Sequence, residues 1–317
     1  MKNNLLILFL ITVPFLFTSC SGKKEQSNTE PEAIIEDKSK LFPDEITKFT
    51  PLPDNPIFTA ANEDDWDSGI RERGFIMKEE DGYHMWYTGF DKSYKNKMLK
   101  LGYAFSEDGI EWTRYKDNPI FSESWVEDMM VWKEDGIYYM FAEGKGDIAK
   151  MLTSTDRIHW ENQGDIDIRK VDGNPISDGP YGTPTVWVED GVWYLFYERG
   201  DLGIWLATSK DRKVWTNVQD DPIIKIGPEA YDKYGVAVNK VIKYQGNYYA
   251  YYHATSLEDW SDWTMNMAVS PDLKTWTKYS ENPIMGDNKS SGFPVYDGEK
   301  FRFYTMHPEV VIHYPSK

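Results

Sequence analysis

Residues 185–215 read TVWVEDGVWYLFYERGDLGIWLATSKDRKVW, and this stretch contains the signals that decide the fold. An apolar run ends at the turn dipeptide Asp190-Gly191, and the aromatic run VWYLFY follows it. An Asp-Gly pair between two such runs is a strong signal for a tight β-hairpin. A third run, GIWLATS, alternates like a strand and ends in the pattern Ser-x-Asp-x-x-x-Trp. The stretch therefore predicts three consecutive antiparallel strands.

The same unit recurs along the chain, which is the mark of a repeat fold. The pattern Ser-x-Asp-x-x-x-Trp occurs four times, as Ser106-Asp108-Trp112, Ser154-Asp156-Trp160, Ser209-Asp211-Trp215 and Ser270-Asp272-Trp276. An Asn-Pro or Asp-Pro pair precedes an Ile at Asn55-Pro56, Asn118-Pro119, Asn174-Pro175, Asp221-Pro222 and Asn282-Pro283. The hairpin turns fall at Asp81-Gly82, Asp135-Gly136, Asp190-Gly191, Gln245-Gly246 and Asp297-Gly298. The segment from each Trp to the next Pro supplies a fourth strand.

Five units of about 48 to 65 residues predict an all-β fold, a five-bladed β-propeller of four-stranded blades. The fifth unit lacks the Ser-x-Asp-Trp element, so we expect the N-terminal segment PLPDNPIF, residues 51–58, to supply its outer strand and close the ring. A two-sheet sandwich or an array of small β domains would also show regularly spaced strands. Neither alternative predicts five similar units.

The N-terminus has the pattern of a targeting segment. Lys2 precedes an apolar run from Leu5 to Phe17, which is too short to span a bilayer but suits a signal peptide. The run ends at Cys20, the only cysteine of the chain, in a context that resembles the bacterial lipobox. We therefore expect a lipoprotein signal peptide (1–19), a lipidated flexible tether (20–45) and a catalytic propeller (46–317). A lipid on Cys20 would anchor the protein to a bacterial membrane, on the periplasmic side or at the cell surface.

Composition limits the function classes. The chain of 317 residues has 35 basic and 52 acidic side chains, a net charge of −17, which argues against a nucleic-acid partner. Thirteen Trp and 21 Tyr residues suit strands and sugar-binding surfaces. No His or Cys spacing suggests a zinc site. We expect a monomer that needs no cofactor.

The Asp-Gly hairpins with aromatic second strands and the Ser-x-Asp-x-x-x-Trp strands resemble the furanosidase-like glycoside hydrolases, the superfamily that includes families 32, 43, 62, 68, 117 and 130. The resemblance covers the chain from residue 50 onward. It implies a sugar-binding funnel at the propeller axis, carboxylates on the inner strands and, as in some relatives, room for a structural Ca²⁺. Asp128 matches the blade-two acid of these enzymes, whereas Gly74 and Gly182 stand where family 43 has its other two acids.

The end of each second strand should lie at the same face as the start of the first, because the two strands are antiparallel. Counting eight residues from each turn gives Gly89, Glu143, Glu198, His253 and Thr305. We therefore predict Asp128, Glu143, Glu198 and His253 as catalytic residues, His253 as a positioning group, a donor to a sugar hydroxyl or the acid itself. The predicted substrate-binding residues are Glu72, Arg73, Trp66, Trp125, Asp178 and His307.

Three functions are compatible with these residues. The leading hypothesis is an exo-acting glycoside hydrolase that removes a terminal sugar from an oligosaccharide of plant or algal origin. A glycan phosphorylase of the family 130 type would need cationic residues such as Arg73 or Arg199 to hold phosphate. A non-catalytic sugar-binding lipoprotein is the third reading, because the blade-one and blade-three acids are missing.

Overall fold

The computed structural model describes residues 41–93 and 98–316. The predicted signal peptide, Cys20 and the tether as far as residue 40 lie outside the described residues. Within the described residues, no helix is long and apolar enough to cross a membrane.

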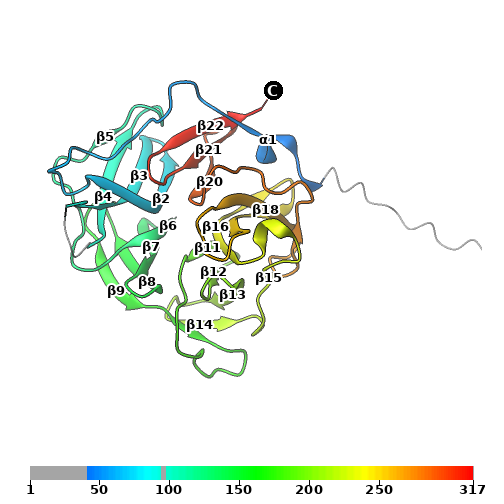
Figure 1. Ribbon diagram of the computed structural model, residues 1–317. Coiled ribbons are helices and arrows are strands. Elements are labelled where there is room, and N and C mark those ends of the chain that lie inside the picture. The colour runs from blue at the N-terminus through cyan, green and yellow to red at the C-terminus, as the bar shows by residue number, and fades with distance from the viewer. Residues whose placement is uncertain (1–40, 94–97, 317) are drawn as a thin grey trace, which may run out of the picture. The chain divides into compact units, whose positions relative to one another are not determined.

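Five antiparallel sheets surround a common centre, and the chain passes through them in sequence order, which confirms the five-bladed propeller (Figure 1). The innermost strands are β2 (Gly69–Glu79), β6 (Glu127–Glu134), β11 (Thr185–Glu189), β16 (Gly235–Tyr244) and β20 (Gly292–Tyr296). The second strands are β3 (Gly82–Phe90), β7 (Ile137–Gly144), β12 (Val192–Glu198), β17 (Asn247–Thr255) and β21 (Phe301–Thr305). The third strands are β4 (Lys100–Ser106), β8 (Ile148–Ser154), β13 (Gly203–Ser209), β18 (Thr264–Ser270) and β22 (Val311–Pro315). The outer strands are β5 (Thr113–Arg114), β9 (Glu161–Asp165), β14 (Val214–Asn217), β19 (Thr277–Lys278) and, for the fifth blade, β1 (Phe49–Pro51).

The third blade is larger than the sequence predicts. Strand β10 (Asp167–Arg169) pairs parallel to β14, and β15 (Ile224–Lys225) pairs with β13, so this sheet has six strands. Two short helical elements, α1 (Asp44–Thr47) and η2 (Ala230–Asp232), complete the described secondary structure.

The N-terminal segment closes the ring, but two residues earlier than expected. Strand β1 pairs antiparallel with β22, and the rest of the expected segment 51–58 forms no further strand but stays bonded to the fifth blade, through the Leu52 N–H to Ile312 at 3.0 Å and a bridge from Phe58 to Val310. The folded part also begins before residue 46, because Phe42 is buried against the rings of Tyr249 and Tyr279. The last residues of the predicted tether thus belong to the propeller.

The repeated motifs hold the blades together. In each Ser-x-Asp turn the Ser hydroxyl donates to the Asp carboxylate, which accepts following backbone N–H groups; Asp108, for example, takes those of Ile110 and Glu111 at 2.8 and 2.9 Å. The repeat Trp of one blade packs edge-to-face on the second strand of the preceding blade. These ring pairs are Trp160 on Trp86, Trp215 on Phe141 and Trp276 on Phe196. Such contacts stabilise the interblade packing.

Candidate active site

One end of the propeller gathers the polar residues. There the innermost strands begin and the second strands end, as the pairing of Glu127 with Glu143 in blade two illustrates. Strands β2, β6 and β16 have β-bulges near this end, and Glu72, Asp128 and Thr183 have positive φ angles of 55°, 43° and 46°. Bulges and strained backbone re-aim side chains and are common at functional sites. We call this end of the axis the funnel.

Arg73 connects four blades at the centre. Its side chain starts on β2 and its guanidinium donates to the carbonyl oxygens of Asp128, Pro184, Val238 and Asn239 at 2.6 to 3.0 Å. It is 1% exposed, and burial lowers its pKa to about 10, so it stays charged. Arg73 is therefore a structural cation beneath the carboxylates, and not the exposed substrate-binding group that the sequence predicts.

Asp128 lies directly above this cation. Its Oδ1 accepts the backbone N–H of Arg73 at 3.2 Å, and its side chain is only half-buried. Burial, and next the charge of Glu72, raise the pKa of Asp128 to about 6. Burial also raises the pKa of the adjacent Glu127 to about 8, although Arg71 and Trp125 donate to its two oxygens.

Glu143 and Glu198 face each other across Gly182. The Thr183 N–H donates to Glu143 Oε2 at 2.8 Å, and the Gly182 N–H donates to Glu198 Oε1 at 2.9 Å. A β-carbon on residue 182 would lie 2.7 Å from Glu198 Oε1 and closer still to Glu143 Oε2. The glycine at this position, which departs from the family 43 pattern, therefore makes room for two carboxylates from neighbouring blades.

The pKa of both of these glutamates is raised. Glu143 is 7% and Glu198 is 3% exposed, and burial raises the pKa of each. For Glu143 the negative charge of Asp128 is the next cause, and the rise is large. Glu198 accepts backbone N–H groups on both oxygens, from Gly182 and from Asp201 at 2.6 Å, which opposes the rise. Glu143 is therefore the better proton donor of the two.

Two further aspartates contribute to the charge of the funnel and were missed from the sequence. Asp147 follows Glu143, and Asp201 follows Glu198; each carbonyl oxygen accepts an N–H of the next blade, from Tyr181 and Val236 at 2.8 Å. Burial, and next Glu198, raise the pKa of Asp201 to about 8. The signal was present, since Gly-Asp precedes Ile148 and Leu202 in the same way.

His253 lies beside these acids as a neutral group. Its Nδ1 is 2.7 Å from Oδ1 of Asn239, whose amide N–H₂ donates to the carbonyls of Ser290 and Gly292, so Nδ1 carries the proton. Burial, and next the charge of Arg73, lower the pKa of His253 to about 3. This lowered pKa argues against the sequence-based suggestion that His253 is itself the acid and favours a neutral imidazole that holds Asn239.

Three predicted substrate-binding residues lie at the funnel. Glu72 forms an ion pair with Arg71 at 2.9 Å, and its backbone N–H donates to His307 Nδ1 at 3.1 Å. Trp125 is held by its indole N–H to Glu127 Oε1 at 2.5 Å. All three side chains are half-buried and are within reach of a ligand.

Trp66 and Asp178 are placed differently. The Trp66 ring stacks on Tyr87 and covers Gly89, so packing accounts for it. Asp178 is exposed on a loop, and it makes no hydrogen bond or ion pair with the funnel carboxylates among the described residues. The guanidinium of Arg199 binds the carbonyls of this loop, at Ser177 and Pro180, instead of pointing free into the funnel.

The centre does not fit a calcium ion. Ca²⁺ needs six to eight oxygen ligands, but the guanidinium of Arg73 already uses the inward carbonyl oxygens. Among the described residues, Glu79, Asp81 and His84 also come close enough to share a metal. There Arg157 donates to all three side chains and supplies the positive charge itself.

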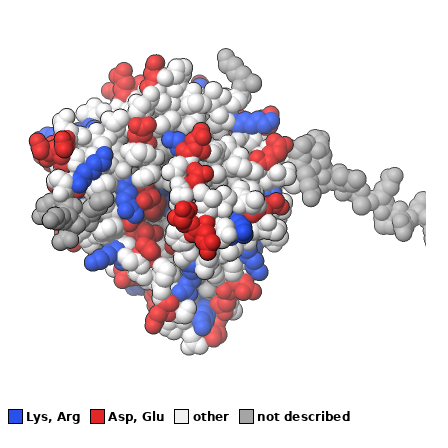
Figure 2. Space-filling model, in the orientation of Figure 1, with Lys and Arg blue, Asp and Glu red and all other residues white. Residues whose placement is uncertain are grey.

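On the face shown in Figure 2, acidic and basic side chains are interspersed.

Comparison with known proteins agrees with this geometry. Residues 53–176 match the family model described as the glycosyl hydrolases family 32 N-terminal domain. A protein of Thermoanaerobacter sp. (strain X514) named 1,2-beta-oligomannan phosphorylase is 27% identical over 66% of this chain and 72% of its own length. A putative glycoside hydrolase from Parabacteroides distasonis superposes with a TM-score of 0.69 at 16% identity, over 86% of this chain and 97% of that chain. A structure from work on GH130 mannoside phosphorylases and hydrolases that target beta-1,2 mannosidic linkages in Candida mannan has a TM-score of 0.66 at 15% identity, over 86% and 95% of the two chains.

The chain therefore has the five-bladed propeller fold of these solved glycoside hydrolase structures, and its residues 53–176 are similar to the family 32 N-terminal domain.

Proposed function

We propose that the protein is an exo-acting glycoside hydrolase, with Glu143 as the general acid and Asp128 as the base. Burial, and next the charge of Asp128, hold the pKa of Glu143 well above its usual range, and its Oε1 has no protein partner among the described residues. Asp128, with a pKa of about 6, is largely ionised at pH 7 and is the more exposed of the two. Glycoside cleavage needs this division between a protonated and an ionised carboxyl group.

The charge of the funnel is the observation that favours hydrolysis, in which water attacks the sugar, over phosphorolysis, in which phosphate attacks it. Its carboxyl groups are those of Glu72, Glu127, Asp128, Glu143, Asp147, Glu198 and Asp201. Its two guanidinium groups are already engaged, Arg73 by backbone carbonyls and Arg71 by Glu127 and Glu72. Burial raises the pKa of Glu127, Glu143 and Asp201 and so reduces this charge, but the ionised Asp128 would still repel a phosphate dianion and would not repel a neutral water molecule.

The substrate is proposed from the relatives. Because one relative is named for 1,2-beta-oligomannan and a structural neighbour targets beta-1,2 mannosidic linkages, β-1,2-linked mannosides are the first substrates to test. Plant and algal oligosaccharides follow, as the sequence suggests.

A phosphorylase is the second candidate, and the Thermoanaerobacter relative favours it. Lys289 supports it as well, because it has no carboxylate partner among the described residues and lies near His307, whose pKa is lowered by burial first and also by the charges of Arg71 and Lys289. Phosphate would then bind between Lys289, His307 and Arg71 at the blade-five side of the funnel.

One assay separates these functions. β-1,2-mannobiose is incubated with and without phosphate, and the products are resolved by chromatography. Free mannose at a rate independent of phosphate supports hydrolysis, sugar 1-phosphate formed only with phosphate supports the phosphorylase, and binding without product supports a sugar-binding lipoprotein.

Variants test the assignment of the acid and the base. Glu143→Gln and Asp128→Asn should each lower kcat by about 10²- to 10⁴-fold. The exposed Glu161→Gln is the matched control and should keep full activity. Wild-type turnover in both site variants would refute this assignment.

We also propose that a lipid on Cys20 holds the protein at a bacterial membrane, on the periplasmic side or the cell surface. The support is the short apolar run before the single cysteine. In a cell fractionation, Cys20→Ser should move the protein from the membrane fraction to the soluble one.

A further inference from the structure

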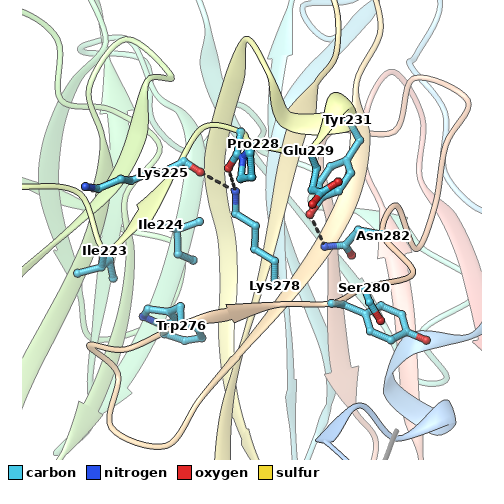
Figure 3. A pocket seen from close by; sticks show the side chains of 12 residues that line it. Ile223, Ile224, Lys225, Pro228, Glu229, Tyr231, Trp276, Lys278, Ser280 and Asn282 are labelled. Atoms are coloured by element: carbon cyan, nitrogen blue, oxygen red, sulfur yellow. Dashed lines mark hydrogen bonds between the residues drawn. The ribbon is translucent and has the colours of Figure 1, made fainter. Parts of the chain in front are cut away.

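A cavity of about 520 Å³ lies outside the funnel, between the outer strands of blades three and four (Figure 3). Its walls come from β15 and the segment after it, and from β19 and the residues that follow. A volume of this size falls in the roughly 300 to 1,000 Å³ range of small-ligand sites.

A long linker builds this cavity. Pro222 of the marker Asp221-Pro222 lies thirteen positions before Gly235, where the innermost strand β16 begins, whereas Pro119 lies only eight positions before Glu127, where β6 begins. Lys278 on β19 binds these additional residues. Its ammonium donates to the carbonyls of Lys225 and Gly227 at 2.7 Å and to the carboxylate of Asp232 at 2.5 Å. The linker is thus fixed in place and forms one wall of the cavity.

Aromatic rings line the opposite wall and the rim. Trp276 is half-buried, and its indole N–H is bonded to the Leu273 carbonyl at 2.9 Å, so the ring is held in one position. Tyr231 and Tyr279 also line the cavity. Fixed aromatic rings of this kind offer flat apolar surfaces against which a pyranose ring can pack.

Three polar side chains at the cavity have no hydrogen-bond partner among the described residues. They are the ammonium of Lys225, the carboxylate of Glu229 and the hydroxyl of Ser280. By contrast, the other polar groups are engaged, since Lys278 binds the linker and Asn282 donates to Tyr231. Donors and acceptors of both charges around an aromatic wall suit a neutral, hydroxyl-rich ligand better than an anion or a cation.

We propose that this cavity is a second, non-catalytic glycan-binding site that holds one or two neutral pyranose units. It lies apart from the funnel residues, and it does not depend on which reaction the funnel performs. It would keep a polymeric or long-chain substrate at the surface of the protein while the funnel cleaves its end.

The test is calorimetric titration of the full chain with three neutral trisaccharides, β-1,2-mannotriose, cellotriose and xylotriose. Glu143→Gln, the variant expected to lose turnover, serves as the background so that cleavage does not add heat. We expect a binding component that Ser280→Trp, which fills the cavity, removes. Glu229→Ala should weaken the same component about tenfold, the loss of one hydrogen bond to a charged group.

Lys274→Trp is the matched control, because it adds an indole on the same blade at an exposed residue that does not line the cavity. It should retain the component. Thermal unfolding shows whether each variant is folded. If the folded Ser280→Trp variant binds all three sugars as its background does, or if the background shows no binding component outside the funnel, the proposal is overturned.

Discussion

Replacement of Gly182 by alanine tests the geometry of the funnel with one methyl group. The added β-carbon would lie 2.7 Å from Glu198 Oε1 and closer still to Glu143 Oε2. Gly182 has no positive φ, so alanine introduces no backbone strain of its own. The effect must therefore come from the two carboxylates.

The expected magnitude follows from these contacts. Overpacking of a well-packed site costs about 1–3 kcal/mol of folding free energy. Relief of both contacts requires shifts of roughly 1 Å in the two side chains, and a misplacement of that size costs about 100-fold in rate. Activity should thus fall far more than stability.

Gly286→Ala is the matched control, since a β-carbon there meets nothing within 4 Å and its φ is also not positive. It should leave activity unchanged and stabilise the fold by up to about 1 kcal/mol, because alanine restricts the unfolded chain. The assays are kcat on the best substrate and urea unfolding of both variants. If Gly182→Ala cleaves substrate like Gly286→Ala, Glu143 and Glu198 do not flank residue 182 as described, or they take no part in the reaction.

Three more results are expected. The rate should rise through about pH 6 as the Asp128 carboxyl ionises. It should fall at higher pH as Glu143, whose pKa is raised by burial, loses its proton. A pH–rate profile that is flat from pH 5 to 9 would contradict these roles. Arg73→Met should lower the free energy of unfolding by about 3–5 kcal/mol, because four buried carbonyls lose their donor. Arg169 has a solvent-accessible guanidinium, so Arg169→Met should change the free energy of unfolding little in the same urea titration. Asp201 has a pKa raised from 3.8 to about 8 in the folded state, so its contribution to stability is full only below pH 3.8 and is lost as the pH rises from there to about 8; Asp201→Asn should exceed the wild type slightly in urea unfolding at pH 5 and by much more at pH 9, and an equal difference at both pH values would argue against a buried, proton-binding Asp201.

Much of the fold could be predicted from the sequence because the repeats are local signals. Turn dipeptides and Ser-x-Asp-x-x-x-Trp act within about ten residues, and the register of each hairpin follows from its turn. The ring closure was predicted with a small error, since pairing of β1 with β22 joins residues 49 and 315, and nothing local fixes that register.

The site was predictable only in part, for a physical reason. Counting along the second strands found Glu143 and Glu198, because antiparallel pairing fixes where those strands end. The role of Arg73 could not be found in this way, since its partners come from three other blades. The neutral state of His253 likewise depends on Asn239 and on burial, which are properties of the assembled ring.

The clustering of acids at the funnel has a consequence for its chemistry. Burial raises the pKa of Glu127, Glu143 and Asp201, and each ionised neighbour raises the others further. The carboxyl groups therefore cannot all be ionised at neutral pH, and the funnel retains protons that an exposed cluster would release. Arg73 supplies one fixed positive charge beneath Asp128, which favours the ionised form of that group over its neighbours. The proposed pairing of an acid and a base at the same pH would follow from the position of Arg73 under the carboxyl groups of the funnel.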